Sequence, residues 1–170
     1  MTVNLFTFVD LYDRLLASAD HLLTKGEAYA REKGIDPETI LTWRLIDDME
    51  PLSFQIMVVC NFAKQWPARA ADLPVPADIG RDLNLAGFRT EIVTARAWLK
   101  ALAPEHFTGR EDVEITVSLG NGTLEPTLSV ARWLTVFATT NLYFHLSTAY
   151  GILRSRGVQI GKPDLFSTGL

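Results

Sequence analysis

The hydrophobic residues of this chain recur at steps of three and four positions over four long stretches, which is the spacing of one face of an α-helix. The first stretch predicts a helix over residues 4–33, which Gly34 would end in a left-handed conformation. Asp36 and Pro37 then predict a short helix to about Thr42, because aspartate caps free N–H groups and proline suits the first helical position.

A group of acidic residues precedes the second long helix. Carboxylates at a helix start face the positive end of the helix dipole. These residues are Asp47, Asp48 and Glu50. Pro51 fits the first turn of this helix, and Pro67 should kink it before it ends near Ala71.

The third helix is expected to begin at Asp82 as N-cap and to end at Pro104. Apolar and polar residues then alternate over residues 111–119, which predicts a half-exposed strand. The Gly-Asn-Gly turn at 120–122 and a short return strand over 123–127 complete a predicted β-hairpin.

The last and longest helix is predicted over residues 129–156, with Ser129 as N-cap and Gly157 at its C-terminal cap. Its predicted inner face comprises Val130, Leu134, Phe137, Asn141, Phe144, His145, Thr148 and Ile152. Asn141 and His145 are the polar pair on this face, one helical turn apart. Four main helices joined by short links, with one hairpin before the last helix, predict an all-α four-helix bundle.

The composition agrees with one soluble domain over residues 1–170, since 48% of the residues are apolar. A net charge of −4 argues against a nucleic-acid surface. The single cysteine, Cys60, has apolar neighbours and fits a reducing compartment as a buried thiol. The N-terminus lacks a secretion signal, and the apolar stretch at 133–153 contains Asn141 and His145, so we expect a cytoplasmic protein that does not span a membrane.

Several segments carry a resemblance to a known family that extends over essentially the whole chain. They are Asp48-Met49, Pro51-Leu52, Gln55, Asn141 to His145, Thr148 to Arg154, Gly157-Val158 and Gly161 to Asp164. The chain resembles an uncharacterised family of the DinB-like four-helix-bundle superfamily of metalloenzymes. The most specific part of this resemblance is residues 141–164.

The resemblance implies a candidate site between the second and last helices. Members of the superfamily often bind a divalent metal through three histidines. The corresponding positions here are Asn141, His145 and one on or near Asp48, where either Asp47 or Asp48 faces the site; only His145 is a histidine. An asparagine oxygen suits hard cations better than zinc or nickel. Gln55, seven residues after Asp48, could form a polar wall of the pocket or lie on the surface.

Two functional hypotheses follow, and no motif decides whether the protein is an enzyme. The first is binding of a small ligand or divalent metal at Asp48, Gln55, Asn141 and His145. The second is a non-catalytic homodimer, formed through the aromatic outer faces of the first and last helices, in which the ancestral metal site has become a structural polar layer. His145 would then be a hydrogen-bonded core histidine.

Overall fold

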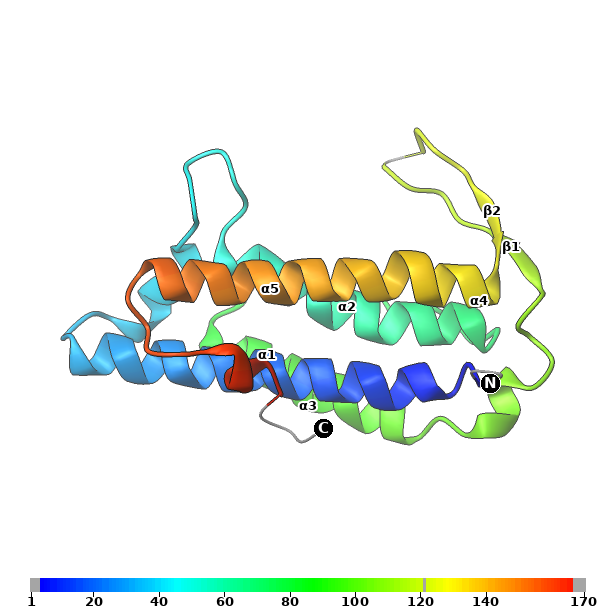
Figure 1. Ribbon diagram of the computed structural model, residues 1–170, viewed down its shortest axis with the longest axis horizontal. Coiled ribbons are helices and arrows are strands. Elements are labelled where there is room, and N and C mark those ends of the chain that lie inside the picture. The colour runs from blue at the N-terminus through cyan, green and yellow to red at the C-terminus, as the bar shows by residue number, and fades with distance from the viewer. Residues whose placement is uncertain (1–3, 121, 167–170) are drawn as a thin grey trace.

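The computed structural model describes residues 4–120 and 122–166 and confirms the predicted helical bundle with a small hairpin (Figure 1). The first three long helices are α1 (Thr7–Glu32), α2 (Leu52–Ala70) and α3 (Leu85–Lys100). The last helix is continuous through α4 (Val130–Arg132), the π-helical segment η3 (Trp133–Ala138) and α5 (Thr139–Ser155). Short helical turns are η1 (Pro37–Thr42), η2 (Pro104–Phe107) and η4 (Lys162–Phe166).

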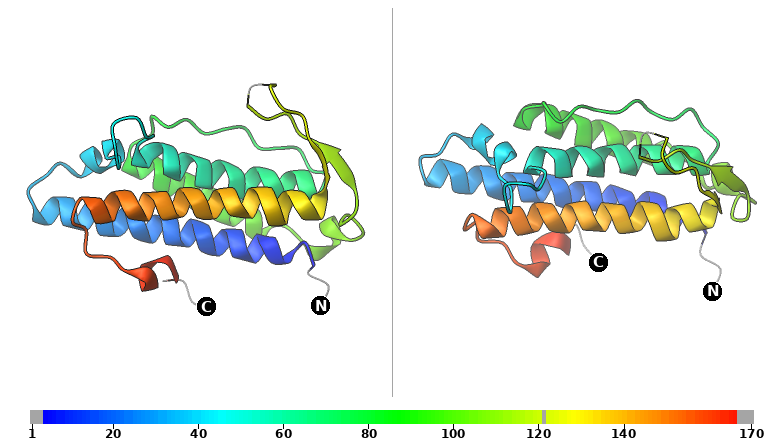
Figure 2. Two further views of the ribbon diagram at one scale, coloured as in Figure 1. Left: turned by 45° about the horizontal axis from the view of Figure 1, so that its top comes forward. Right: turned by 90° about the horizontal axis from the view of Figure 1, so that it is seen from above.

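The link between α2 and α3 differs from the short connection that was predicted. Residues 71–84 run back along α2, so α2 and α3 point in the same direction while α1 and α5 point the opposite way (Figures 1 and 2). Asn61 of α2 holds this link by accepting from the Ile79 N–H at 2.9 Å and donating to the Ile79 carbonyl at 3.3 Å. Gln65 donates to the Pro76 carbonyl at 3.1 Å. These side chains supply hydrogen bonds that an extended segment cannot make within itself.

Aromatic residues close the core between α2 and the last helix. Trp66 stacks on Trp133 with ring centroids 5.0 Å apart, and Phe137 meets both rings edge-on. The Trp133 indole also donates to the Ile115 carbonyl at 3.0 Å, which ties the hairpin to the bundle. Cys60 is fully buried, as expected, and burial raises the pKa of its thiol to about 12.

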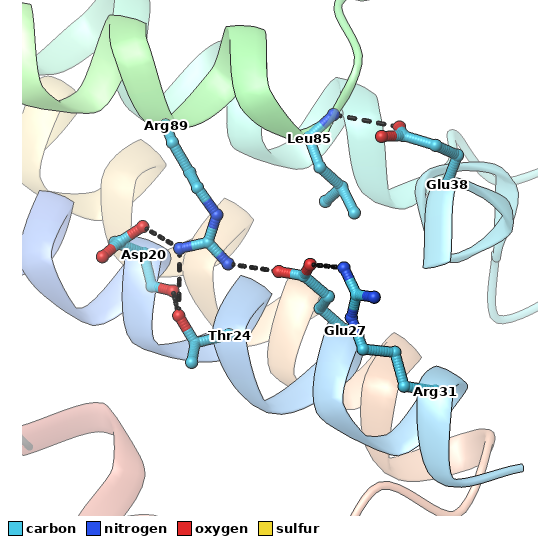
Figure 3. A network of polar contacts seen from close by, with 7 residues as sticks. All are labelled: Asp20, Thr24, Glu27, Arg31, Glu38, Leu85 and Arg89. Carbon is cyan, nitrogen blue, oxygen red and sulfur yellow. Dashed lines mark hydrogen bonds and ion pairs between the residues drawn. The ribbon is translucent and has the colours of Figure 1, made fainter. Parts of the chain in front are cut away.

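Charged side chains join α1 to α3 at the border of the core (Figure 3). Arg89 of α3 donates to Asp20 and Glu27 of α1, each at 2.8 Å, and to the Thr24 hydroxyl at 3.0 Å. The hydrogen bond from Arg31, together with Arg89, lowers the pKa of Glu27. One guanidinium thus connects three turns of α1.

The ends of the helices confirm some predictions and correct others. The Asp36 carboxylate caps η1 by accepting from the Glu38 N–H at 3.1 Å, and Ser129 caps the last helix. The N-cap of α3 is Asn84, however, and not Asp82, which lies exposed in the preceding link. The acidic residues Asp47, Asp48 and Glu50 precede α2 in a turn, as predicted, and Pro51 is the N-cap of α2 and not a residue of its first turn.

The hairpin is shorter than predicted. It pairs β1 (Glu114–Thr116) with β2 (Thr127–Ser129) in antiparallel register, with Ile115 opposite Leu128. A single bridge between Leu119 and Leu124 continues the pairing towards the turn, in which Asn121 lies outside the described residues. Most residues of the strands are at least partly exposed, so little apolar burial is available to extend the ladder.

The π-helical segment η3 changes which residues of the last helix face the core. A π segment places an extra residue in its turn and so rotates the residues that follow it. Leu134 is buried as predicted, but Phe144 is 59% exposed while Leu142 and Leu146 are buried. The predicted inner face is therefore wrong for Phe144.

Tyr12 of α1 donates a hydrogen bond to a backbone carbonyl of the π-helical segment η3. The Leu134 carbonyl accepts from the Tyr12 hydroxyl at 3.3 Å and from the Thr139 hydroxyl at 2.7 Å. Tyr12 is fully buried, and this burial raises the pKa of its phenol. The tertiary contact with α1 thus satisfies the polar groups of η3 inside the core.

The C-terminal segment packs on the bundle. His21 of α1 hydrogen-bonds Asp164 of η4 at 2.8 Å, and the Ser18 hydroxyl donates to the Leu165 carbonyl at 2.8 Å. His21 therefore lies where α1 meets the C-terminal segment. Within the described residues, no helix is both long and apolar enough to cross a membrane.

Candidate functional site

His145 and Gln55 form the centre of the candidate site between α5 and α2. The Nδ1 atom of His145 lies 2.7 Å from Oε1 of Gln55. The Nε2 atom of Gln55 in turn donates to the Glu50 backbone carbonyl at 3.1 Å. Gln55 is only 3% exposed, so its amide is held in place by packing as well as by these two bonds.

This chain of hydrogen bonds determines which nitrogen of His145 carries the proton. A backbone carbonyl can only accept, so the NH₂ end of Gln55 must face Glu50 and its oxygen must face the imidazole. That oxygen also only accepts, so Nδ1 of His145 is the donor. Burial lowers the pKa of His145, which favours the neutral ring. Its Nε2 atom then carries a free lone pair.

The lone pair of His145 is accessible from outside the bundle. The residue is half-buried, and Nε2 makes no hydrogen bond with any residue in 4–120 or 122–166. No side-chain nitrogen or oxygen of these residues is both buried and without a hydrogen bond, so Nε2 reaches the surface. The ring contacts Phe54 and Phe144 edge-on, with centroids 5.9 and 5.2 Å away. The site is thus a hydrogen-bond acceptor flanked by apolar rings.

Asn141 and Asp48 do not belong to the hydrogen-bonded chain of His145 and Gln55. The Asn141 amide donates to the Phe137 carbonyl of its own helix at 2.8 Å, in the segment where η3 leads into α5. Asp48 is exposed in the turn before α2. A hydrogen bond joins His145 to Gln55, but none joins either residue to Asn141 or Asp48 within the described parts of the chain.

The described residues do not offer a cluster of histidine, cysteine and acidic side chains for a chelated divalent metal. Structural and catalytic zinc sites need three or four closely placed ligands. The described residues contain no group of three or more histidine, cysteine, aspartate or glutamate side chains that could hold a metal ion. The amide oxygen of Gln55 beside His145 already accepts from Nδ1.

Two parts of the site were not recognised in the sequence. The Glu50 carbonyl that orients Gln55 is a backbone group, for which no side-chain pattern exists. Phe54 lies next to Gln55 in α2. Its contact with His145 could be inferred from helix periodicity only if the position of the last helix were already known.

Comparison with known proteins agrees with this architecture. The fold is that of a DinB-like helical bundle, and a DinB family member protein from Shewanella denitrificans has the same fold. That structure is 30% identical, has a TM-score of 0.82, and the match covers 95% of this chain and 90% of that chain. No curated protein matches this chain.

The family follows from the sequence match over most of the chain. Residues 6–166 match the domain of unknown function DUF1993, and the chain belongs to that family. The resemblance predicted from the sequence is therefore confirmed.

Proposed function

We propose that this bundle binds a small organic molecule at His145, without a chelated divalent metal. A hydroxyl, thiol or amine of the ligand donates to Nε2, while an apolar part of the ligand packs against Phe54 and Phe144. The observation that carries the proposal is the chain from the Glu50 carbonyl through Gln55 to Nδ1, which leaves the lone pair facing outward.

The physical support is the preorganisation of this acceptor. Gln55 is almost fully buried, and both ends of its amide are hydrogen-bonded in the chain that orients the His145 ring. Because burial lowers the pKa of His145, the ring accepts a hydrogen bond at neutral pH. A group held in its binding geometry loses little freedom when a ligand arrives.

Phenol and anisole are matched probes, since both carry an aromatic ring but only phenol donates a hydrogen bond. Phenol should shift the backbone amide signals of Phe54 and Phe144, whose rings flank His145, in a saturable way in NMR spectra, and anisole should shift them less. A His145→Phe variant should lose the difference, whereas the His106→Gln control should retain it, because His106 lies in the separate turn η2.

A parallel titration with zinc, nickel, manganese and magnesium tests the metal hypothesis for Asp48, Asn141 and His145. Stoichiometric metal binding that disappears in the His145→Phe variant would contradict the proposal. Equal responses to phenol and anisole would also contradict it, because the lone pair would then contribute nothing to binding.

The second candidate function is the homodimer with a structural polar layer. Exposed apolar side chains favour the outer face of the last helix for such contact: Val136 is 58% exposed, Tyr143 43% and Phe144 59%. Leu45 and Ile46 of the turn before α2 are also exposed, at 39% and 58%. Light scattering at micromolar concentration, compared between the native chain and a Tyr143→Lys variant, tests this candidate. A monomer in both would refute it.

A further inference from the structure

A cleft lies at the same end of α2 as Gln55 but is lined by other residues than those of the His145 site. It has a volume of about 400 Å³ and is bordered by η1 and Arg44, by the start of α2, and by residues 81–84 of the link to α3. Neither His145 nor Gln55 lines it. The cleft is open to solvent and large enough for the headgroup of a small molecule.

Ser53 gives this cleft a hydrogen-bond donor with no partner in the described chain. The residue is 9% exposed, and its hydroxyl makes no hydrogen bond with residues 4–120 or 122–166. The hydroxyl is not sealed within the protein, because no buried side-chain oxygen lacks a hydrogen bond there. Since Ser53 lines the cleft, its hydroxyl opens into it.

The first turn of α2 adds backbone donors beside Ser53. The Leu52 N–H donates to the Trp43 carbonyl at 2.8 Å and the Gln55 N–H to the Pro51 carbonyl at 3.3 Å. The N–H groups of Ser53 and Phe54 have no acceptor among the residues that the structure describes. They stand at the positive end of a 19-residue helix, where an anion is favoured.

Two arginines line the cleft with these donors. Arg44 donates to the Asp47 backbone carbonyl at 3.2 Å, and no carboxylate of the described residues pairs with it. Arg81 pairs with Glu50 at 2.9 Å, with both side chains about half exposed. Such an exposed pair is weak and can open to a competing anion.

Two carboxylates at the same cleft limit the charge that it accepts. Glu38 is occupied, since it accepts from the Leu85 N–H at the start of α3 at 3.0 Å (Figure 3). Asp82 is exposed and would repel an anion from the rim. The local balance therefore suits a single oxyanion on a small molecule, and not a polyanion such as nucleic acid.

We propose that the cleft binds the carboxylate or phosphate group of a small molecule, held by Ser53, the first turn of α2 and Arg44. The contribution of Arg44 is charge-assisted, and that of Ser53 is a neutral hydrogen bond. This site is independent of the one at His145, so either can fail without the other.

The test is NMR titration of the native chain with inorganic phosphate and, separately, with acetate. Saturable shifts should appear at the Ser53 and Phe54 amides. Arg44→Gln should weaken binding about tenfold, the usual effect of losing a charge-assisted hydrogen bond. Ser53→Ala should weaken it about threefold, and alanine is compatible with a helix start. Asp82→Asn should strengthen it.

Arg132→Gln is the matched control, because Arg132 is exposed at the start of the last helix and does not line the cleft. It removes the same charge and should leave the affinity unchanged. A response to phosphate alone would assign a phosphoryl ligand, and a response to acetate alone a carboxylate; both support the site. Unshifted amides at about 10 mM of each anion, or equal losses in Arg44→Gln and Arg132→Gln, would overturn it.

Discussion

Replacing Gln55 by glutamate should reverse the response of His145 to pH. Glutamate has nearly the same shape, but places a carboxylate where the amide oxygen lies 2.7 Å from Nδ1. In the native protein burial lowers the pKa of His145. A carboxylate at this position favours the imidazolium, so the pKa should rise above its ordinary value of about 6.5.

The size of the effect follows from the geometry. Opposite charges about 4 Å apart attract by about 4 kcal/mol at an effective dielectric constant of about 20. Because His145 is half-buried and partly solvated, about 1–2 kcal/mol of this should remain, which corresponds to about one pKa unit. The variant also loses the donor to the Glu50 carbonyl, at a cost of about 1–3 kcal/mol at high pH.

These shifts imply opposite slopes of stability against pH. In the native protein the folded state binds fewer protons than the unfolded chain, so stability should decrease as the pH falls through about 6.5. In the Gln55→Glu variant the folded state binds more protons at His145. Its contribution to stability should therefore grow as the pH falls through the raised pKa, and should be complete below about 6.5.

NMR titration of the His145 ring and urea unfolding between about pH 5 and pH 8 provide the two measurements. Nitrogen shifts of the native ring should show the proton on Nδ1. Gln159→Glu, at an exposed position, is the control and should leave the pKa of His145 unchanged. A native ring protonated on Nε2, or no rise of the pKa in Gln55→Glu, would refute the reasoning.

Three further changes test the fold, each read from thermal or urea unfolding. Tyr12→Phe should destabilise by about 1–2 kcal/mol, since the buried carbonyl of η3 loses one donor; an unchanged stability would show that the π turn does not need α1. Gly157→Ala should cost about 1–2 kcal/mol, because φ is 92° and a Cβ would lie 2.9 Å from the Tyr29 hydroxyl. Arg89→Met should cost about 1 kcal/mol or less, and salt should reduce the difference, because these ion pairs are partly exposed.

Local patterns in the sequence predicted most of the helices. Periodicity predicted α1, α2 and α3 to within a few residues, and the caps at Asp36 and Ser129 were also correct. Asp82 was predicted as the cap of α3, but the cap is Asn84; both residue types can cap a helix, and only the path of the preceding link decides between them.

The sequence indicated two residues of the candidate site but not the contact between them. His145 attracts attention in an apolar helix, and Gln55 belongs to the segments that carry the family resemblance. Their contact, the orientation of the Gln55 amide and the tautomer of His145 depend on how α2 and α5 pack, and on a carbonyl at Glu50. Periodicity within one helix carries no information on these contacts.

The sequence by itself determined the number of main helices, their approximate ends and the family, because helix periodicity and capping act over a few neighbouring residues. Only the tertiary structure decided the path of residues 71–84 and the π turn in the last helix. The first depends on side chains of α2 that bond the link, and the second on the Tyr12 hydroxyl reaching from α1. Both are interactions between distant segments, whose free energy exists only once the helices pack together.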